Sequence, residues 1–385
     1  MDSEEQTEEY DTSLTEAHTY LGEGLENMRG RTILDDTVTH QMLVLAGRNV
    51  TLIPGETLPL LLHHNEEVRP WLKTHKVFGI LYPRQTVYGT TADLRSFKEE
   101  QSHDGYWTLT VKAEGSQRFK VIEKRIISQV IFMAEVRILP DRRLLPPEQH
   151  LLLEGNRLRN VMGKLTPFPQ WVYNQCHERI LMKELSEVMK SILGKDPPVK
   201  DPTAFSYWVV ANVPINEGDR KVLLALNSSQ ERLFMAKHYL KLNCKICCAE
   251  CLSEISTKDH MFSMSTSGAQ GTFVNMAGYI HEMLTVRLVD GVSYVGASSE
   301  HYSWFPGYAW HIIECAECGM HVGWRFSTQK NLQPQKFWGL SRGSVRFAPI
   351  DNMSQLDKDV FMATAQMSRA YLDSTPETYE TPPDL

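Results

Sequence analysis

Four cysteines in the C-terminal half of this 385-residue chain have the spacing of a metal site. They form two Cys-x-x-Cys pairs, Cys248 with Cys251 and Cys315 with Cys318, and 63 residues (252 to 314) separate the pairs. A Cys-x-x-Cys turn holds two thiolates where one tetrahedral Zn²⁺ can bind both, with Zn–S distances of about 2.3 Å. Two such turns supply four thiolates and leave no position for a catalytic water. The sequence therefore predicts one structural Zn²⁺, whose binding free energy is part of the folding free energy of this region.

The spacing alone leaves other interpretations open. Cys244 and Cys247 form a further Cys-x-x-Cys, so the first pair of ligands could lie earlier in the chain. Buried free thiols and a redox-active pair are the alternatives to zinc. The remaining cysteine, Cys176, falls in a helical pattern, and we expect it to pack against neighbouring helices.

Aromatic residues gather on both sides of the second cysteine pair. The segment Ser303-Trp-Phe-Pro-Gly-Tyr-Ala-Trp310 places Pro306-Gly307 between Trp304 and Trp310, and Trp324 follows the cysteines. A Pro-Gly turn allows the two indoles to face one another. A cage of aromatic walls binds a flat uncharged ring or a quaternary ammonium group. The same rings could instead form the core of a small β domain.

Sequence signatures of catalysis are missing. The chain has no Gly-x-Ser-x-Gly elbow, Walker Gly-Lys-Ser/Thr, His-Glu-x-x-His or Gly-x-Gly-x-x-Gly motif. Its 14 histidines show no metal-ligand or acid–base spacing. We therefore predict no catalytic residues and a binding function.

The candidate binding residues lie in the last of three segments that differ in hydrophobic periodicity. Short apolar or alternating runs predict strands, and a helical period over about 146–242 predicts a helical bundle. The predicted strands cover 42–45, 51–53, 77–81, 106–111, 118–122, 134–139, 261–265, 271–275, 279–288 and 319–326. We predict an α+β multidomain fold with a largely disordered acidic segment (1–30), a β domain (31–143), a helical bundle (144–242), a zinc-bound all-β domain (243–350) and a disordered tail (351–385).

Composition narrows the class of protein. The net charge is −7 and the Lys and Arg residues are scattered, so no basic stripe for nucleic acid is present in the sequence. No apolar run reaches the roughly 18–20 residues needed to cross a bilayer. The first ten residues are acidic and do not resemble a secretory signal, so we expect a reducing compartment, no nucleic-acid partner and no membrane.

Several motifs resemble the cereblon family, the substrate receptors of cullin-RING ubiquitin ligases. Ser303–Trp310 and Pro334-Gln-Lys-Phe-Trp-Gly-Leu340 carry the most specific part of the resemblance. Weaker matches follow in the same order at 11–14, 18–22, 52–60, 89–92, 117–121 and 205–207. The resemblance implies a Lon N-terminal-like β domain and a helical bundle that binds the large subunit of the damage-specific DNA-binding adaptor. It also implies a C-terminal β-tent (CULT) domain that binds thalidomide-type ligands.

The resemblance assigns roles to individual residues. It implies Cys248, Cys251, Cys315 and Cys318 as zinc ligands, because the residues after Cys251 match the family pattern. It implies a pocket of Trp304, Trp310 and Trp324 with Phe326 beneath, and contacts from Asn275, His281 and Trp324 to a recruited substrate loop. The implied ligands are protein cyclic-imide degrons and thalidomide-type molecules, and the implied location is cytoplasm and nucleus.

The sequence departs from the family at two places near the pocket. Glu300-His-Tyr-Ser-Trp304 has one residue more than the family's Glu-His-Ser-Trp, so His301 or Tyr302 could take the place of the family histidine. Asn275-Met-Ala-Gly-Tyr279 replaces Asn-Pro-His-Gly-Tyr, and Ile312 replaces a smaller side chain of some members. The sequence therefore supports recruitment of a substrate loop less strongly than it supports ligand binding.

Three other functions share features with a ligase receptor. A Lon-type protease would need an ATPase module and a Ser-Lys dyad, and a zinc-containing methionine sulfoxide reductase would need a reactive cysteine beyond the metal ligands. Neither is visible in the sequence. A methyl-lysine reader would use the same aromatic cage and stays open at the level of sequence.

Overall fold

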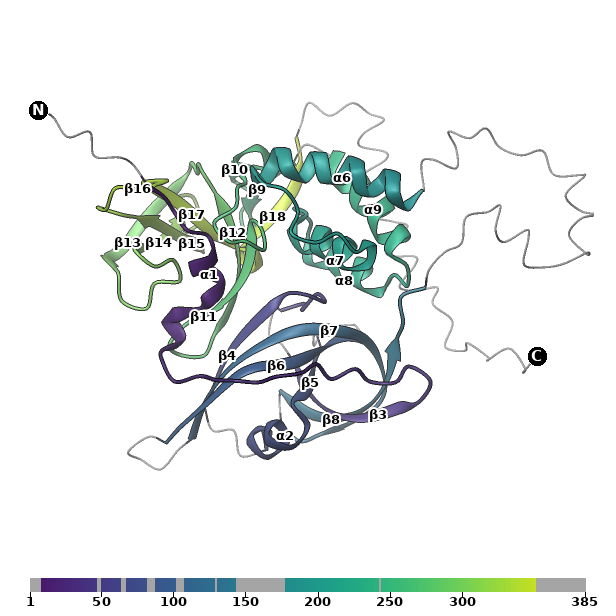
Figure 1. Ribbon diagram of the computed structural model, residues 1–385. Coiled ribbons are helices and arrows are strands. Elements are labelled where there is room, and N and C mark those ends of the chain that lie inside the picture. The colour runs from purple at the N-terminus through teal and green to yellow at the C-terminus, as the bar shows by residue number, and fades with distance from the viewer. Residues whose placement is uncertain are drawn as a thin grey trace, which may run out of the picture.

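The computed structural model describes residues 8–46, 50–63, 67–81, 87–101, 107–128, 130–142, 177–241 and 244–350 (Figure 1). The expectations for residues 143–176, including Cys176, and for the tail 351–385 lie outside these ranges. Within them the chain forms a β unit, a group of helices and a second β unit, in that order. This order agrees with the periodicity of the sequence.

The first β unit is a seven-stranded sheet in the order β2-β6-β5-β3-β8-β7-β4. Its strands are β2 (Glu26–Asn27), β3 (Thr39–Ala46), β4 (Thr57–His63), β5 (Val77–Leu81), β6 (Tyr88–Gln101), β7 (Trp107–Ile126) and β8 (Ile131–Leu139). An additional pairing of β6 with β7 closes five of these strands into a ring. Alternating residues of β7, such as Leu109, Val111 and Ala113, are fully buried inside it. Helix α2 (Val68–His75) buries Val68 and Leu72 against the same core.

Four described helices follow: α6 (Glu178–Leu193), α7 (Pro202–Asn212), α8 (Glu217–Ala225) and α9 (Ser229–Lys241). Helix α6 buries Leu181, Leu185 and Met189 at four-residue spacing, which is one face of an amphipathic helix. Helix α7 begins at the N-cap Asp201, which accepts a hydrogen bond from the Ala204 N–H, and it is buried along much of its length. These helices lie beside both β units (Figure 1).

The C-terminal unit contains a three-stranded sheet and a six-stranded antiparallel sheet. The smaller sheet is formed by β10 (Glu254–Thr257), β9 (Cys244–Cys248) and β18 (Val345–Pro349). The larger has the order β11 (Gln270–Val274), β12 (Ile280–Val286), β17 (Lys336–Ser341), β15 (His321–Ser327), β14 (Ala309–Cys315) and β13 (Val292–Ser299). Two predicted strands are wrong. Residues 51–53 lie in no strand, and residues 261–265, which follow the 3₁₀ turn η2 (Lys258–His260), pair only through isolated bridges from Met261 to Val286 and from Ser265 to Gly268.

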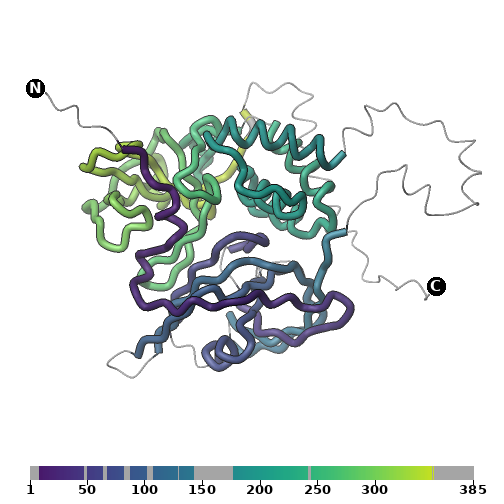
Figure 2. Tube along the Cα trace, viewed as in Figure 1, coloured from purple at the N-terminus to yellow at the C-terminus, as the bar shows by residue number. Residues whose placement is uncertain are grey.

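The N-terminal segment corrects a second expectation. We expected residues 1–30 to be largely disordered, yet from Glu8 onward the segment is ordered and crosses the molecule (Figure 2). It contains β1 (Glu8–Glu9), α1 (Ser13–Ala17) and η1 (Thr19–Leu21), and β1 pairs in parallel with β16 (Leu332–Gln333). The acidic composition indicated disorder, but Tyr10 and Leu21 of the segment are buried, and Tyr10 packs edge to face against Tyr308, far away in the sequence.

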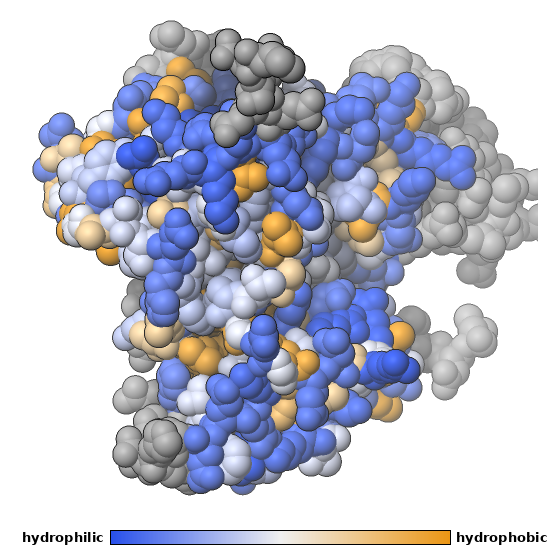
Figure 3. Space-filling view, turned by 60° about the vertical axis from the view of Figure 1, so that its left-hand side comes forward, coloured by the Kyte–Doolittle hydropathy of each residue, from blue (hydrophilic) through white to orange (hydrophobic). Residues whose placement is uncertain are grey.

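Figure 3 shows a largely hydrophilic face with scattered apolar residues. Within the described residues, no helix is long and apolar enough to span a membrane.

Candidate zinc centre and aromatic pocket

The four predicted zinc ligands converge on one point at an end of the C-terminal unit. Their sulfur atoms all lie within 4.8 Å of one another. The Sγ atoms of Cys248 and Cys318 are 3.6 Å apart, as are those of Cys251 and Cys315. Four sulfurs placed about 2.3 Å from one tetrahedral Zn²⁺ would lie about 3.8 Å from each other. The spacing of the four thiols therefore fits one zinc ion.

Two tight turns of similar geometry hold these cysteines. In the first, the Leu252 N–H donates to the Cys248 carbonyl, and Leu252 has a left-handed φ of 64°. In the second, the Gly319 N–H donates to the Cys315 carbonyl, and Gly319 has a φ of 72°. Strand β9 leads into the first turn and β14 into the second, so the zinc site joins the two sheets of the unit. A metal at this point would fix one sheet against the other.

The thiols cannot all ionise without a cation between them. Burial would raise the pKa of Cys315, but hydrogen bonds from Ser253 and from the backbone N–H groups of Cys318 and Glu317 lower it to about 6. The backbone N–H of Met320 favours the thiolate of Cys318, yet burial and the adjacent sulfurs raise its pKa to about 12. A divalent cation supplies the charge that lets four adjacent thiolates form together.

The other Cys-x-x-Cys pair, Cys244 with Cys247, lies outside the zinc cluster. Cys244 and Cys247 lie on β9 and are buried, and neither belongs to the four-sulfur cluster. Burial raises the pKa of the Cys244 thiol to about 11, which keeps this thiol protonated and poorly reactive. The structure thus resolves the register in favour of Cys248 and Cys251.

The residues of the predicted aromatic pocket lie on and beside the larger sheet. The rings of Trp304 and Trp324 meet edge to face, with centroids 4.8 Å apart and an interplanar angle of 73°. His281 of β12 packs against both indoles, at 5.5 Å from Trp304 and 5.0 Å from Trp324. Burial, together with the nearby His321, lowers the pKa of His281 to about 4, so the imidazole is neutral at pH 7.

The third tryptophan, Trp310 of β14, is hydrogen-bonded to the turn that precedes this strand. The Trp310 Nε1–H donates to the His301 carbonyl at 2.9 Å, and the Trp304 Nε1–H donates to the Val274 carbonyl at 3.2 Å. The side chain of His301 is exposed, whereas Tyr302 has a left-handed φ of 55° and its ring contacts Tyr20. The carbonyl of His301 thus lies beside the pocket indole, while the Tyr302 ring lies against the N-terminal segment.

Phe326 forms the floor of this aromatic group. It is 1% exposed and stacks on Phe337 with centroids 5.1 Å apart. It pairs across the strands with Trp310. Core and cage are therefore continuous: Trp304 and Phe326 are buried, and Trp310 and Trp324 are half-buried at the rim.

Three further residues pack against or beside these aromatic side chains. The sequence did not assign them to the predicted pocket. Phe273 stacks on Trp304 with centroids 5.2 Å apart, and His18 lies 5.7 Å from Phe273. The Tyr20 hydroxyl hydrogen-bonds with His18 Nδ1 at 2.9 Å and accepts from the Val274 N–H at 3.3 Å. The sequence signals in this segment were its aromatic residues and the weak family match at 18–22, and neither indicates these contacts.

Asn275 starts the hairpin turn between β11 and β12. Its Oδ1 accepts from the N–H groups of Ala277 and Tyr279, and its Nδ2 lies 3.4 Å from His281 Nε2. Gly278 at the turn lies against Leu61 of β4, since a Cβ there would be 2.6 Å from the Leu61 carbonyl oxygen. The structure brings Asn275, His281 and Trp324 together at one side of the pocket.

Comparison with known proteins decides the family. The chain is 36% identical to cereblon of Gallus gallus over 377 residues, which cover 87% of this chain and 84% of that protein. It is 37% identical to cereblon of Xenopus tropicalis over 380 residues (88% and 84%), and 34% identical to that of Danio rerio (87% and 87%). This chain belongs to the cereblon family.

Two other comparisons concern parts of this cereblon-family chain. Residues 229–358 match the family described as Yippee zinc-binding/DNA-binding/Mis18, centromere assembly. This match and the four-sulfur cluster establish one structural zinc site in the C-terminal unit. A Lon N-terminal domain protein from Xanthomonas campestris aligns with a TM-score of 0.33 and 20% identity, covering 50% of this chain and 95% of that one. Membership of the cereblon family supports a cereblon-type substrate receptor as the general role of the chain.

Proposed function

We propose that this chain is the substrate-recognition subunit of a cullin-4-type RING E3 ubiquitin ligase. In this proposal the pocket of Trp304, Trp310 and Trp324 binds cyclic-imide degrons or thalidomide-type ligands, and the bound protein is presented for ubiquitination. The chain is then a non-catalytic receptor. Its proposed partners are the large subunit of the damage-specific DNA-binding adaptor and, through it, a cullin-RING core. Its proposed location is the cytoplasm and nucleus.

One observation carries the choice of ligand: apolar indole walls and backbone polar groups lie at the same edge of the pocket. Trp304 and Trp324 meet edge to face, and the His301 carbonyl lies at the Trp310 indole nitrogen. A cyclic imide has one N–H donor between two carbonyl acceptors, and the rest of its ring is aliphatic. It can donate to a backbone carbonyl of the 301–304 turn while its methylenes contact the indoles.

The neighbouring side chains favour an uncharged ring over a methylated ammonium. His281 is neutral at pH 7 because burial lowers its pKa to about 4, and Asn275 carries no charge. A trimethylated ammonium gains from the indole faces but has no N–H to donate to a backbone carbonyl of the 301–304 turn, whereas the imide has one. The methyl-lysine reader is therefore the second candidate, and the aromatic walls alone favour it.

The test uses peptides with the full-length, zinc-loaded chain. One peptide ends in a cyclised Asn or Gln imide, a second ends in the uncyclised residue, and a third carries trimethyl-lysine. We expect capture of the first peptide only, and loss of that capture in Trp324→Ala. Trp107→Ala, which removes a tryptophan of the first β unit, is the matched control. Capture of the trimethyl-lysine peptide, or unchanged capture of the imide peptide by Trp324→Ala, would contradict the proposal.

A further inference from the structure

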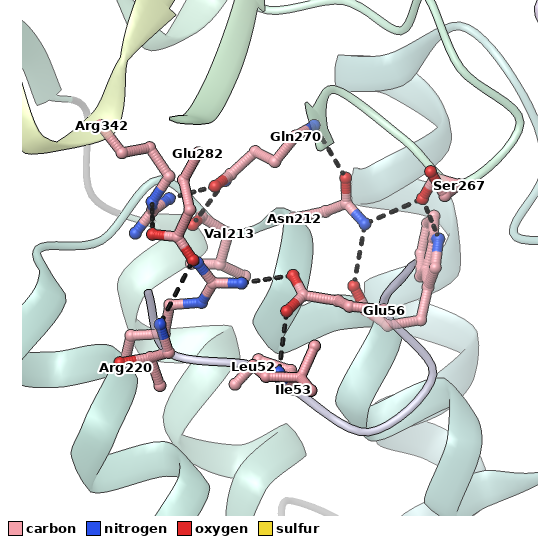
Figure 4. Close-up of polar contacts among 12 residues, drawn as sticks. Leu52, Ile53, Glu56, Asn212, Val213, Arg220, Ser267, Gln270, Glu282 and Arg342 are labelled. Atoms are coloured by element: carbon pink, nitrogen blue, oxygen red, sulfur yellow. Dashed lines mark hydrogen bonds and ion pairs between the residues drawn. The ribbon is translucent and has the colours of Figure 1, made fainter. Parts of the chain in front are cut away.

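The two edges of the larger C-terminal sheet have different surroundings. At one edge β11 is largely buried, and its Gln270 is hydrogen-bonded to Asn212 of α7 and to the Val213 carbonyl (Figure 4). At the other edge β13 pairs with β14 on one side, and no described strand pairs with its outer side. Figure 1 shows β13 at the end of the sheet away from the helices. The sheet therefore has one covered edge and one open edge, β13.

The open edge is exposed along the consecutive residues 293–298. Tyr294 and Val295 are 46% and 40% exposed. Alternate residues of β13 direct their N–H and C=O groups away from β14, where no described strand receives them. Proteins commonly protect such an edge with charged side chains or proline, and the regular part of this edge, Val292-Ser-Tyr-Val295, has neither. An edge of this kind can accept a further strand.

One face of the open edge continues into the aromatic pocket. Val295 pairs with Ile312 of β14, and Ile312 pairs with Trp324 of β15. Residues that pair across neighbouring strands lie on the same face of a sheet, so these three side chains form one row. None of the three is fully buried. On this face, an added strand would place its side chains next to an apolar row.

The other face of the open edge carries cations. The Tyr294 ring lies 5.2 Å from the His311 ring and 5.6 Å from the guanidinium carbon of Arg325. Lys336 of β17 is exposed and lies diagonal to Arg325 across the strand pair. The ion pairs of the described residues include neither Arg325 nor Lys336, and the Arg325 Nε–H has no hydrogen-bond partner there. This face is therefore complementary to acidic side chains.

The two faces together define the chemistry of the occupant. An extended segment fits if its side chains alternate between apolar and acidic, because successive side chains of a strand point to opposite faces. A second copy of β13 does not fit. Its Val-Ser-Tyr-Val segment brings no carboxylate to Arg325, and the approach of the second copy would place two groups of like charges near each other.

We propose that β13 is a docking edge for a partner protein, which adds an extended segment to the sheet as a further strand. Acidic side chains of this segment lie toward Arg325, and apolar side chains lie toward Val295 and Ile312. The added strand lies beside the aromatic pocket, so one bound protein can occupy both. That the partner is a ligase substrate rests on the proposed function, whereas the strand pairing does not.

Hydrogen exchange on the full-length, zinc-loaded chain first tests whether the edge is open. In the free chain, the outward-facing amides of a peptide covering residues 292–299 are expected to exchange at nearly their intrinsic rates at every protein concentration. Protection that rises with protein concentration would show that a second copy covers the edge. Protection that is independent of concentration would show that another part of the chain covers it. Either result overturns the proposal.

Titration with a synthetic peptide of alternating glutamate and valine tests the chemistry of the occupant. We expect saturable binding that slows exchange of the outward-facing amides of 292–299. The counterpart with lysine in place of glutamate is expected to bind at least about tenfold more weakly. Methylation of the backbone nitrogens on one edge of the glutamate peptide removes its main-chain donors, and methylation of each edge in turn is expected to show one edge whose loss abolishes binding. Equal binding of the glutamate and lysine peptides, binding that survives methylation of either edge, or no protection at 292–299 contradicts the proposal.

A variant of the chain tests the cation directly. Arg325→Gln is expected to weaken binding of the glutamate peptide by about fivefold. Arg69→Gln is the matched control, because it removes a guanidinium that lies over Trp107 in the first β unit. Equal affinities in these two variants would exclude Arg325 from the docking edge. The peptide comparisons decide the proposal even if Arg325→Gln fails to fold. No imide is present in these titrations, so their failure refutes the docking edge and not the cyclic-imide pocket.

Discussion

Ser253 stands between the two cysteine turns and contacts a sulfur from each. Its Oγ lies 3.1 Å from the Sγ atoms of Cys251 and Cys315. Groups that hydrogen-bond to metal ligands orient them, and their loss commonly costs 10–100-fold in metal affinity. The hydroxyl of Ser253 is therefore part of the zinc centre, although it does not bind the metal.

We predict one zinc per chain and a zinc affinity about 10–100-fold lower in Ser253→Ala, measured by competition with a chromogenic chelator. The backbone bond from the Cys248 N–H to the Ser253 carbonyl survives the change, so only the hydroxyl is tested. Ser256→Ala is the control, because its hydroxyl donates to the Leu288 carbonyl and no contact with sulfur is seen for it. Equal zinc affinity in the two variants would show that the hydroxyl has no effect.

His18 makes the attachment of the N-terminal segment dependent on pH. Burial, and secondly Lys112, lowers its pKa to about 3, below its ordinary value of 6.5. A histidine that must stay neutral in the folded state stabilises fully above pH 6.5, and this stability is lost as the pH falls towards 3. Between pH 7 and pH 5 we expect the segment to lose about 2 kcal/mol of stability.

Hydrogen exchange of a peptide covering residues 10–21, corrected for the intrinsic rate at each pH, measures this loss. His18→Phe keeps a ring between Tyr20 and Phe273 and is expected to flatten the pH dependence. His40→Phe changes a half-buried histidine of β3 and serves as the control. If the pH dependence persists in His18→Phe, another titratable group is its cause.

The role of a residue could be predicted where the sequence pattern that indicates it is formed by its neighbours in the chain. Each zinc turn is a local pattern, so Cys248, Cys251, Cys315 and Cys318 could be identified from spacing and family resemblance. Phe273, His18 and Tyr20 could not be placed at the pocket, because their partners are contributed by the fold. Nothing in the sequence near Tyr20 shows that residue 302 will lie 5.1 Å away.

At the scale of elements, the hairpin between β11 and β12 brings the pocket next to the first β unit. Its turn residue Gly278 has a φ of 80°, and a Cβ there would meet the Leu61 carbonyl of β4 at 2.6 Å. Only glycine fits both the left-handed backbone and this close approach. The hairpin is thus held by a backbone contact as well as by the ion pair between Glu282 of β12 and Arg220 of α8.

We predict that Gly278→Ala separates the hairpin from β4 and destabilises the chain by about 1–3 kcal/mol. Gly296→Ala is the control, because Gly296 has a similar φ of 77° but no atom within 4 Å of an added Cβ. The expected result is faster exchange at residues 57–63 in the first variant only. Equal effects in both variants would mean that backbone strain, and not the contact with Leu61, is responsible.

Besides the two-residue β2, two long strands of the first β unit were missed, for different physical reasons. Strand β4 reads Thr-Leu-Pro-Leu-Leu-Leu-His, without alternation and with a proline, and it forms at the end of the sheet beside β7. Strand β6 is interrupted by charged residues such as Lys98 and Glu100, yet it pairs with β5 and β7 on its two sides. Tertiary pairing outweighs local propensity in both cases.

At the scale of the whole molecule, helix α6 exposes an apolar side chain on its outer face within the described residues. Helix α6 buries Leu181, Leu185 and Met189, whereas Val188 on its outer face is 40% exposed. If helices α6–α9 dock on the ligase adaptor, the outer face of α6 is available for the contact. The remaining part of the predicted bundle, residues 144–176, lies outside the described residues.

We predict that Val188→Asp lowers co-purification with the adaptor by about tenfold, since it places a charge in a desolvated contact, without lowering the melting temperature. Ile122→Asp is the control, because it introduces the same charge at an exposed aliphatic residue of the first β unit. Adaptor binding that is equal in the two variants would exclude the outer face of α6 from the interface.

The most direct test of the cyclic-imide pocket is a calorimetric titration of the full-length, zinc-loaded chain with glutarimide and with N-methylglutarimide. Methylation removes the single N–H donor and leaves the ring in place, so it asks whether a backbone acceptor of the 301–304 turn recognises the imide. We predict saturable binding of glutarimide, and binding of N-methylglutarimide that is at least about tenfold weaker. Equal affinity for the two rings, or no binding of either, would contradict it.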